Sequence, residues 1–176
     1  MDDDGFGNEQ IRIQCKVVVQ DEAVVVDFAG TSQAVTGNIN CPLPVTAAAV
    51  FYAIRCLMAE ETPACAGVFE AITIKAEPGS LVHASRPSAT AAGNVETSMR
   101  IVDVIFGALA KALPGHIPAA SQGTMNNIAM GKRGEGGWDY YETLGGGAGA
   151  SAAADGAHCV QVHMTNTLNT PAEVVE

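Results

Sequence analysis

Short runs of β-branched residues, separated by turn residues, open the chain. Residues 11–20 and 23–30 are rich in valine and are joined by Asp21-Glu22. Side chains that branch at Cβ fit a pleated surface, so this pattern predicts two strands with a tight turn between them. Glycine and asparagine in residues 30–40 then indicate a loop.

The first helical pattern lies in residues 45–60. Val50, Ile54 and Leu57 fall at positions i, i+4 and i+7, which gives a helix one apolar face. Two prolines precede this segment, as is common before the first turn of a helix. We predict a helix here with Thr46 as its N-cap.

A second helical pattern runs over residues 95–113. Pro114-Gly115 ends it, and Asn94 stands where an N-cap is expected. The residues that share its apolar stripe are Ile101, Val104, Ile105 and Leu109. The second helix is therefore also expected to have one apolar face.

The remaining pattern predicts short strands and loops. After residue 121 no helical period is sustained. The expected strands are residues 69–76, 81–84, 123–130, 138–143 and 156–163. Together these elements predict an α+β fold, with mixed strands and two main helices, that forms an incomplete domain. We expect a single partial domain over residues 1–176, with residues 1–10 flexible.

Composition narrows the class of protein. A formal net charge of -10 with only nine basic residues argues against nucleic acid as a partner. The five cysteines are odd in number and form no CxxC pair, which favours reduced thiols. The acidic start lacks the pattern of a signal peptide, and Arg55 interrupts the longest apolar run. We expect a cytoplasmic protein without a membrane partner.

A glycine run at residues 145–150 is the most distinctive segment. Successive glycines can present backbone N–H groups to an anion or a developing oxyanion. They can equally form a flexible connection between strands, and the residues alone favour that connection. No Lys-Ser or Lys-Thr follows at the spacing of a phosphate-binding loop.

The sequence patterns for a metal site and for a catalytic nucleophile are weak. His158 and His163 are five residues apart, so in a regular strand they would lie on opposite faces and would not share a metal ion. We predict no metal ligands in this chain. No G-x-S-x-G sequence surrounds a serine, and Cys159 is expected to be a small buried hydrophobe.

Two clusters of Asn and Thr, residues 122–127 and 165–170, are denser than turns require. Such side chains satisfy irregular backbone. They also line pockets for polar, neutral substrates such as amides. The residues themselves leave both interpretations open.

Several motifs, in the same order, resemble the hydantoinase B/oxoprolinase family over about residues 24–176. They are residues 27–32, 37–40, 93–98, 120–127, 140–143 with 145–147, and 163–167. The resemblance implies the B-type component of an ATP-dependent enzyme that opens a cyclic amide such as N-methylhydantoin or 5-oxoproline. It also implies an A-type partner subunit that uses ATP and Mg²⁺ to phosphorylate this small-molecule substrate. No cofactor is expected within this chain.

The chain departs from the family pattern at its ends. The family's B component is considerably longer, and its metal-binding stretch, rich in His and Asp, has no counterpart in this chain. A divalent metal is therefore expected on a part that precedes the first strand. This polypeptide resembles an internal fragment, which we expect to be inactive in isolation.

The side chains and backbone groups of the matching motifs suggest a role for each candidate residue. Glu142 is the candidate acid/base, and Gly145, Gly146 and Gly147 offer N–H donors to an oxyanion. The residues expected to act on or orient the substrate are His163, Asn166 and Asn169. In the alternative, these motifs form a scaffold and subunit interface of such a complex or of an acetone carboxylase-like enzyme.

Overall fold

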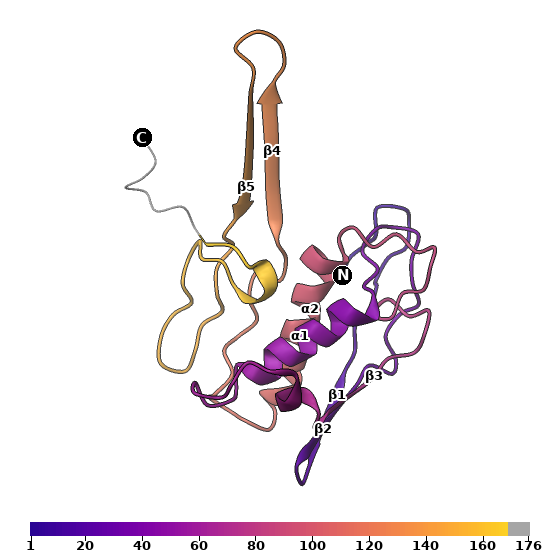
Figure 1. Ribbon diagram of the computed structural model, residues 1–176, viewed down its shortest axis with the longest axis vertical. Helices are drawn as coiled ribbons and strands as arrows, with labels where there is room; N and C mark the ends of the chain where they lie inside the picture. The colour runs from indigo at the N-terminus through magenta and orange to yellow at the C-terminus, as the bar shows by residue number, and fades with distance from the viewer. Residues whose placement is uncertain (169–176) are drawn as a thin grey trace.

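The computed structural model describes residues 1–168, and within them it confirms a small α+β domain with two α-helices (Figure 1). The helices are α1 (Leu43–Arg55) and α2 (Ser98–Leu109). A hairpin of strands β4 (Asn126–Lys132) and β5 (Trp138–Leu144) extends away from the helices. Three short helices are also described. They are the 3-10 helices η1 (Ala66–Phe69) and η3 (His163–Thr165) and the π-helix η2 (Gly93–Thr97).

The main sheet contains β1 (Lys16–Gln20), β2 (Ala23–Asp27) and β3 (Ile72–Lys75) in that order. β1 and β2 are antiparallel, so the predicted turn at Asp21-Glu22 is confirmed. β2 pairs with β3 in parallel. A parallel pair needs a crossover, and α1 lies in the connection between these two strands.

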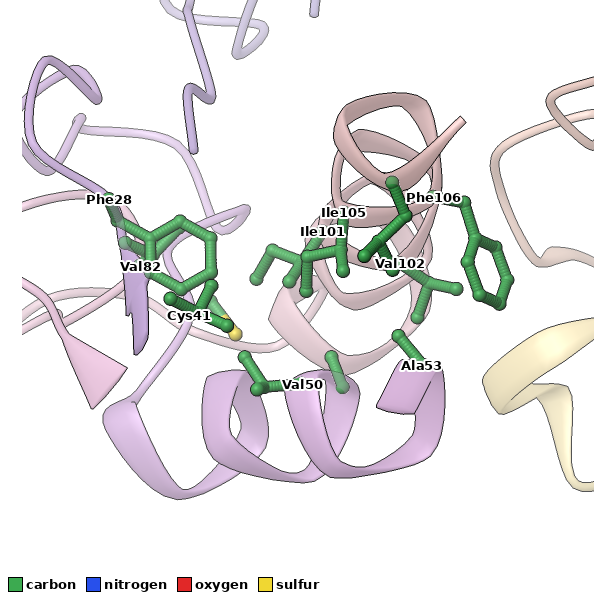
Figure 2. Packing of buried hydrophobic residues seen from close by; sticks show 12 residues of the cluster. Phe28, Cys41, Val50, Ala53, Val82, Ile101, Val102, Ile105 and Phe106 are labelled. Carbon is green, nitrogen blue, oxygen red and sulfur yellow. The ribbon is translucent and has the colours of Figure 1, made fainter. Parts of the chain in front are cut away.

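The hydrophobic core lies where the two helices face each other beside the sheet. Figure 2 shows Val50 and Ala53 of α1 opposite Ile101 and Ile105 of α2, and all four are fully buried. Alanine on α1 lets the helix backbones approach closely, so modest side chains fill the space between them. Phe28, Cys41 and Val82 close the core at one end.

The predicted start of the first helix is wrong. α1 begins at Leu43 after Pro42, and no side chain caps it. Proline suits this first turn because its missing N–H would have no partner there. Thr46 is instead buried inside the helix, and its hydroxyl donates a hydrogen bond of 2.6 Å to the carbonyl of Val82. The helix also ends earlier than predicted, at Arg55.

The second helix also begins differently from the prediction. The π-helix η2 precedes α2, so Asn94 lies within a helical turn rather than at an N-cap. Gly93 allows this turn to lie close to the backbone of Asn40, because a Cβ at residue 93 would lie only 2.3 Å from the carbonyl oxygen of Asn40. The stripe prediction is confirmed for Ile101, Ile105 and Leu109, which are buried.

Two predicted strands are absent from the described residues. Residues 81–84 are irregular although Leu81 and Val82 are fully buried, because their backbone bonds go to the loops at Ser32 and Cys41. Residues 156–163 are also irregular, and Cys159 and His163 have positive φ angles of 54° and 52°. Extended backbone cannot continue through such residues.

Residues 1–10 fold back on the loop around Gly37. The carboxylate of Asp4 accepts hydrogen bonds from the backbone N–H of Phe6 (2.9 Å), of Asn8 (3.1 Å) and of Gly37 (2.9 Å). The amide group of Asn8 donates a fourth bond of 2.7 Å. Burial acts to raise the pKa of Asp4, but these hydrogen bonds outweigh it and lower the pKa to about 2.

We expect this carboxylate to make stability depend on acid pH. Because the folded pKa of Asp4 lies below its ordinary 3.8, its contribution is present above pH 3.8 and is lost as pH falls towards 2. Urea midpoints measured across this range should decline more steeply in the wild type than in Asp4→Asn. Equal slopes in the two proteins would contradict this assignment.

No helix within the described residues is long and apolar enough to span a membrane.

Candidate functional site

Three segments that are distant in sequence meet at Asp103, in the middle of α2. Its Oδ1 lies 3.1 Å from Nε2 of His163, and its Oδ2 accepts a bond of 3.0 Å from the hydroxyl of Ser121. The backbone N–H of Ser121 donates a further bond of 3.3 Å to Oδ1. The side chains of Asp103 and His163 are each 12% exposed, so the pair is largely withdrawn from water.

The Asp103 carboxylate is held in its ionised form. Burial acts to raise the pKa of Asp103, but the hydrogen bond from His163, the two from Ser121 and the nearby imidazole lower it below its usual value. An ionised Asp103 can only accept hydrogen bonds, so Nε2 of His163 carries a hydrogen and donates a hydrogen bond to the carboxylate. The carboxylate therefore fixes the tautomer of the imidazole ring.

Aromatic residues and backbone geometry fix the position of His163. The ring centroid of Tyr52 lies 5.8 Å away in an edge-on arrangement, and that of Phe106 lies 5.6 Å away. The Tyr52 hydroxyl lies 3.4 Å from Nδ1, a long hydrogen bond in which Nδ1 accepts. His163 has a φ of 52°, a strained conformation for a residue other than glycine. Such a conformation persists only where the surrounding structure holds it.

Ser121 is not arranged as a nucleophile. In a Ser-His-Asp triad the serine hydroxyl donates to the imidazole. Here it donates to Asp103, and its oxygen also accepts a bond of 3.0 Å from the N–H of Gly123. The Ser121 hydroxyl therefore orients the carboxylate and the 121–123 turn.

A cleft of about 330 Å³ adjoins this cluster. Its lining residues include Arg100, Asp103, Val104 and Ser121. Arg100 donates through Nε to Glu96 at 2.9 Å. A larger hollow of about 480 Å³ lies on the β4–β5 hairpin. Its lining does not include Asp103, Ser121 or His163. We take the smaller cleft as the candidate site because Asp103 and Ser121 of the cluster line it.

The glycine run packs against the chain's own backbone. The N–H of Gly147 donates to the carbonyl of Val160 at 3.1 Å, so it is already paired. Gly147 has a φ of 109°, and a Cβ there would lie 2.8 Å from the carbonyl oxygen of Ala157. A Cβ on Gly146 would overlap the Gln122 side chain. A side chain at either position would therefore clash, because Gly147 lies close to backbone and Gly146 lies close to the Gln122 side chain. Gly145 precedes them directly after β5.

The other candidate residues are spread around the region. Glu142 is exposed on β5, where the Tyr140 hydroxyl donates to it. Asn166 is exposed and ends η3 in the left-handed conformation at φ 50°. Asn169 lies outside the described residues. Of the candidates named from sequence, His163 alone contacts Asp103 among the bonds of the described residues.

Sequence reasoning missed Asp103, Tyr52 and Ser121 as the partners of His163. One signal for Asp103 was present, because it is the single charged residue in the apolar run Ile101-Val102-Asp103-Val104-Ile105. A charge within such a run usually has a partner. The expectation that Cys159 is buried was wrong, since it is exposed. Among residues 1–168 no cluster of three His, Cys, Asp or Glu side chains could hold a metal ion.

Comparison with known proteins places these observations in a family. The profile described as Hydantoinase B/oxoprolinase matches residues 1–176. 5-oxoprolinase 1 of Arabidopsis thaliana is 42% identical over 150 residues, 85% of this chain and 11% of that protein. 5-oxoprolinase of Dictyostelium discoideum is 36% identical over 174 residues, 99% of this chain and 13% of that protein.

An uncharacterized protein of Methanocaldococcus jannaschii is 40% identical over 97% of this chain and 30% of its own length. The ATP-dependent caprolactamase from Pseudomonas jessenii has the same fold, with a TM-score of 0.75 at 22% identity over 91% of this chain and 28% of that one. The chain thus spans 30% or less of the length of these relatives. By its match over the full length, the chain belongs to the hydantoinase B/oxoprolinase family.

Proposed function

We propose that this chain is a segment of the enzyme component that completes ATP-dependent hydrolysis of a cyclic amide. Support comes from the family and from its named relatives, two 5-oxoprolinases and a fold neighbour called an ATP-dependent caprolactamase. All three names refer to lactam rings. The observation that carries the proposal is the Asp103–His163 pair beside the cleft.

Ring opening requires proton transfer at the amide, and the pair supplies a suitable imidazole. Asp103 orients His163 through Nε2, which leaves Nδ1 to exchange a proton. Its present partner, the Tyr52 hydroxyl, is 3.4 Å away, a weak bond that a substrate atom could replace. Asn166 would orient the substrate from the turn that follows His163. We propose that Asn169 also contacts the substrate.

Glu142 and the glycine run complete the proposed site. Glu142 is accessible to a substrate held by another part of the enzyme, and it would act as a second acid/base. The N–H groups of Gly145 and Gly146 would donate to a developing oxyanion. Gly147 would contribute by shaping this segment, because its own N–H is paired with Val160.

We further propose that an A-type subunit, which binds ATP and Mg²⁺, phosphorylates the substrate in the same complex. A divalent metal would be held by another part of the assembly, since the described residues do not form a ligand set. No step assigned to this chain depends on that metal. We propose a cytoplasmic location for the enzyme, because an odd number of cysteines favours reduced thiols over a disulfide framework.

A substitution at His163 tests this proposal in the full-length enzyme assembled with its A-type partner. His163→Gln should lower kcat/KM by about 10²-fold, because an acid/base group contributes about that much. Glu142→Gln tests the second acid/base in the same assay. His158→Gln is the matched control, since His158 is an exposed histidine five residues away. Normal turnover in His163→Gln would overturn the role of this residue.

A scaffold role is the second candidate, and the paired state of both His163 nitrogens favours it. In that case the pair serves to attach residues 160–168 to α2. His163→Gln would then impair co-purification with the A-type partner, and turnover per assembled complex would be unchanged. Co-purification and turnover measured on the same preparations separate the two roles.

A further inference from the structure

The hydroxyl of Tyr52 faces two hydrogen-bond acceptors. One is Nδ1 of His163, at 3.4 Å. The other is the sulfur of Cys56, one helical turn further along the chain. The N–H of Cys56 donates to the carbonyl of Tyr52 at 3.0 Å, so helical geometry continues one residue past the end of α1. Side chains four residues apart in a helix lie on the same face.

The thiol of Cys56 interacts with the Tyr52 hydroxyl. Burial raises the pKa of Tyr52, and the hydrogen bond to Cys56 and the charge of its thiolate form raise it further. In this bond the hydroxyl donates and the sulfur accepts. A phenol has one hydroxyl hydrogen, so the half-buried Tyr52 donates either to Nδ1 of His163 or to the sulfur.

The two acceptors bear on how Nδ1 of His163 becomes available. In the structure as it stands, both ring nitrogens are paired, Nε2 with Asp103 and Nδ1 with Tyr52. A substrate atom that takes Nδ1 must displace the Tyr52 hydroxyl. Leaving a hydroxyl unpaired away from water is unfavourable. A second acceptor on the same helix face avoids this loss.

We propose that Tyr52 and Cys56 are positioning residues for His163, and that the Tyr52 hydroxyl turns from Nδ1 to the Cys56 sulfur when substrate binds. This inference rests on the proposed acid/base role of His163. Before binding, Tyr52 and Asp103 hold opposite sides of the imidazole. After binding, Nδ1 faces the substrate and the hydroxyl remains paired. The hydroxyl hydrogen changes its acceptor, and it stays bonded to the Tyr52 oxygen.

The imidazole keeps its place while the hydroxyl turns. Asp103 holds Nε2 at 3.1 Å, and the rings of Tyr52 and Phe106 contact the imidazole with centroids 5.8 and 5.6 Å away. None of these contacts uses the Tyr52 hydroxyl. Tyr52→Phe therefore removes the hydrogen bond to Nδ1 and keeps the ring contact.

The first test is the pH profile of kcat/KM, which reports the free enzyme, measured on the full-length enzyme assembled with its A-type partner. Tyr52 donates to the neutral imidazole and so opposes its protonation. In the described chain the titratable groups that face His163 are Asp103 on α2 and Tyr52 on α1, with Cys56 beyond Tyr52. In Tyr52→Phe the acidic limb of the profile should move to higher pH by about half a unit.

The second test separates KM from kcat in the same assembly. Cys56 is exposed in the described chain, so Cys56→Ala leaves no cavity. It removes the acceptor needed once substrate is bound, both before and during the reaction. KM should rise about fivefold while kcat stays within about twofold. Cys56→Ser, which keeps an acceptor, should restore KM, and Cys65→Ala, at another exposed cysteine, is the matched control.

A double variant connects the two residues. In the Tyr52→Phe background, Cys56→Ala should leave KM unaltered, because the hydroxyl that uses the sulfur is gone. An unmoved acidic limb in Tyr52→Phe, or a wild-type KM in Cys56→Ala, would overturn the inference. So would equal rises in KM for Cys56→Ala and Cys56→Ser. If His163→Gln still loses about 10²-fold in kcat/KM, only this inference fails; normal turnover in His163→Gln would remove the proposed function with it.

Discussion

A Gly93→Ala variant is expected to lose about 3 kcal/mol of unfolding free energy, because the added methyl group has no space. Its Cβ would lie 2.3 Å from the carbonyl oxygen of Asn40 and 3.1 Å from Cα of Cys41. Both contacts are with backbone, so no side-chain rotation can relieve them. The variant should unfold at a lower urea concentration than the wild type.

The loss would extend beyond the contact itself. The buried Asn40 side chain donates to the carbonyls of Gly37 and Ala89, both at 2.8 Å, and accepts from the N–H of Val35. Moving its backbone strains these bonds together. Hydrogen exchange should therefore quicken at Val35 as well as in the π-helix.

Gly107→Ala provides the control within the following helix. A Cβ at Gly107 meets nothing within 4 Å, and alanine is favoured over glycine in a helix interior by about 1 kcal/mol. This variant should be as stable as the wild type or more stable. Destabilisation of both variants by the same amount would show that the close approach at Gly93 is not the cause.

Replacing Asp103 by alanine should cost about 3 kcal/mol of stability and release the segment that carries His163. The substitution leaves the Nε2 proton of His163 and the hydroxyl of Ser121 without their acceptor, in a largely buried place. Each unsatisfied group costs about 1–3 kcal/mol. Urea unfolding measures the total, and hydrogen exchange at residues 160–168 measures the local release.

Ser121→Ala tests whether the loss in the Asp103 variant comes from the carboxylate itself or from its bond with Ser121. It removes the hydroxyl bond to Oδ2 and the bond from the N–H of Gly123, and it keeps the backbone bond and the contact with His163. We expect a loss of about 1 kcal/mol and slow exchange at residues 160–168. Equal losses in the two variants would mean that Asp103 does not hold the His163 segment.

The elements that could be predicted are those whose pattern is local. The β1–β2 hairpin follows from β-branched runs around a two-residue turn, and the β4–β5 hairpin was placed within three residues. The stripe of the second helix follows from spacing, whereas the predicted stripe of the first is only partly confirmed, because Leu57 lies beyond the end of α1 and is 41% exposed. The helix starts were wrong because the Thr46 hydroxyl bonds to the distant carbonyl of Val82 and because Asn94 lies inside the π-helix η2. Tertiary contacts override the capping preference of Thr46.

The site was predictable only in part for the same reason. His163 was named from its motif, but Asp103 and Tyr52 lie 60 and 111 residues away from it in sequence. No local rule connects such positions. The strand predicted for residues 156–163 fails because positive φ angles at Cys159 and His163 turn the backbone to bring the imidazole onto α2.

Sequence by itself determined the α+β class, the apolar stripe of the second helix and the family motifs, because each depends on spacing or identity within a few residues. Tertiary structure alone decided that the glycine run packs on the chain's own backbone, that Asp103 is the partner of His163, and that the β4–β5 hairpin extends away from the helices. These features depend on which segments meet in space, and burial of the shared core between α1 and α2 sets that arrangement.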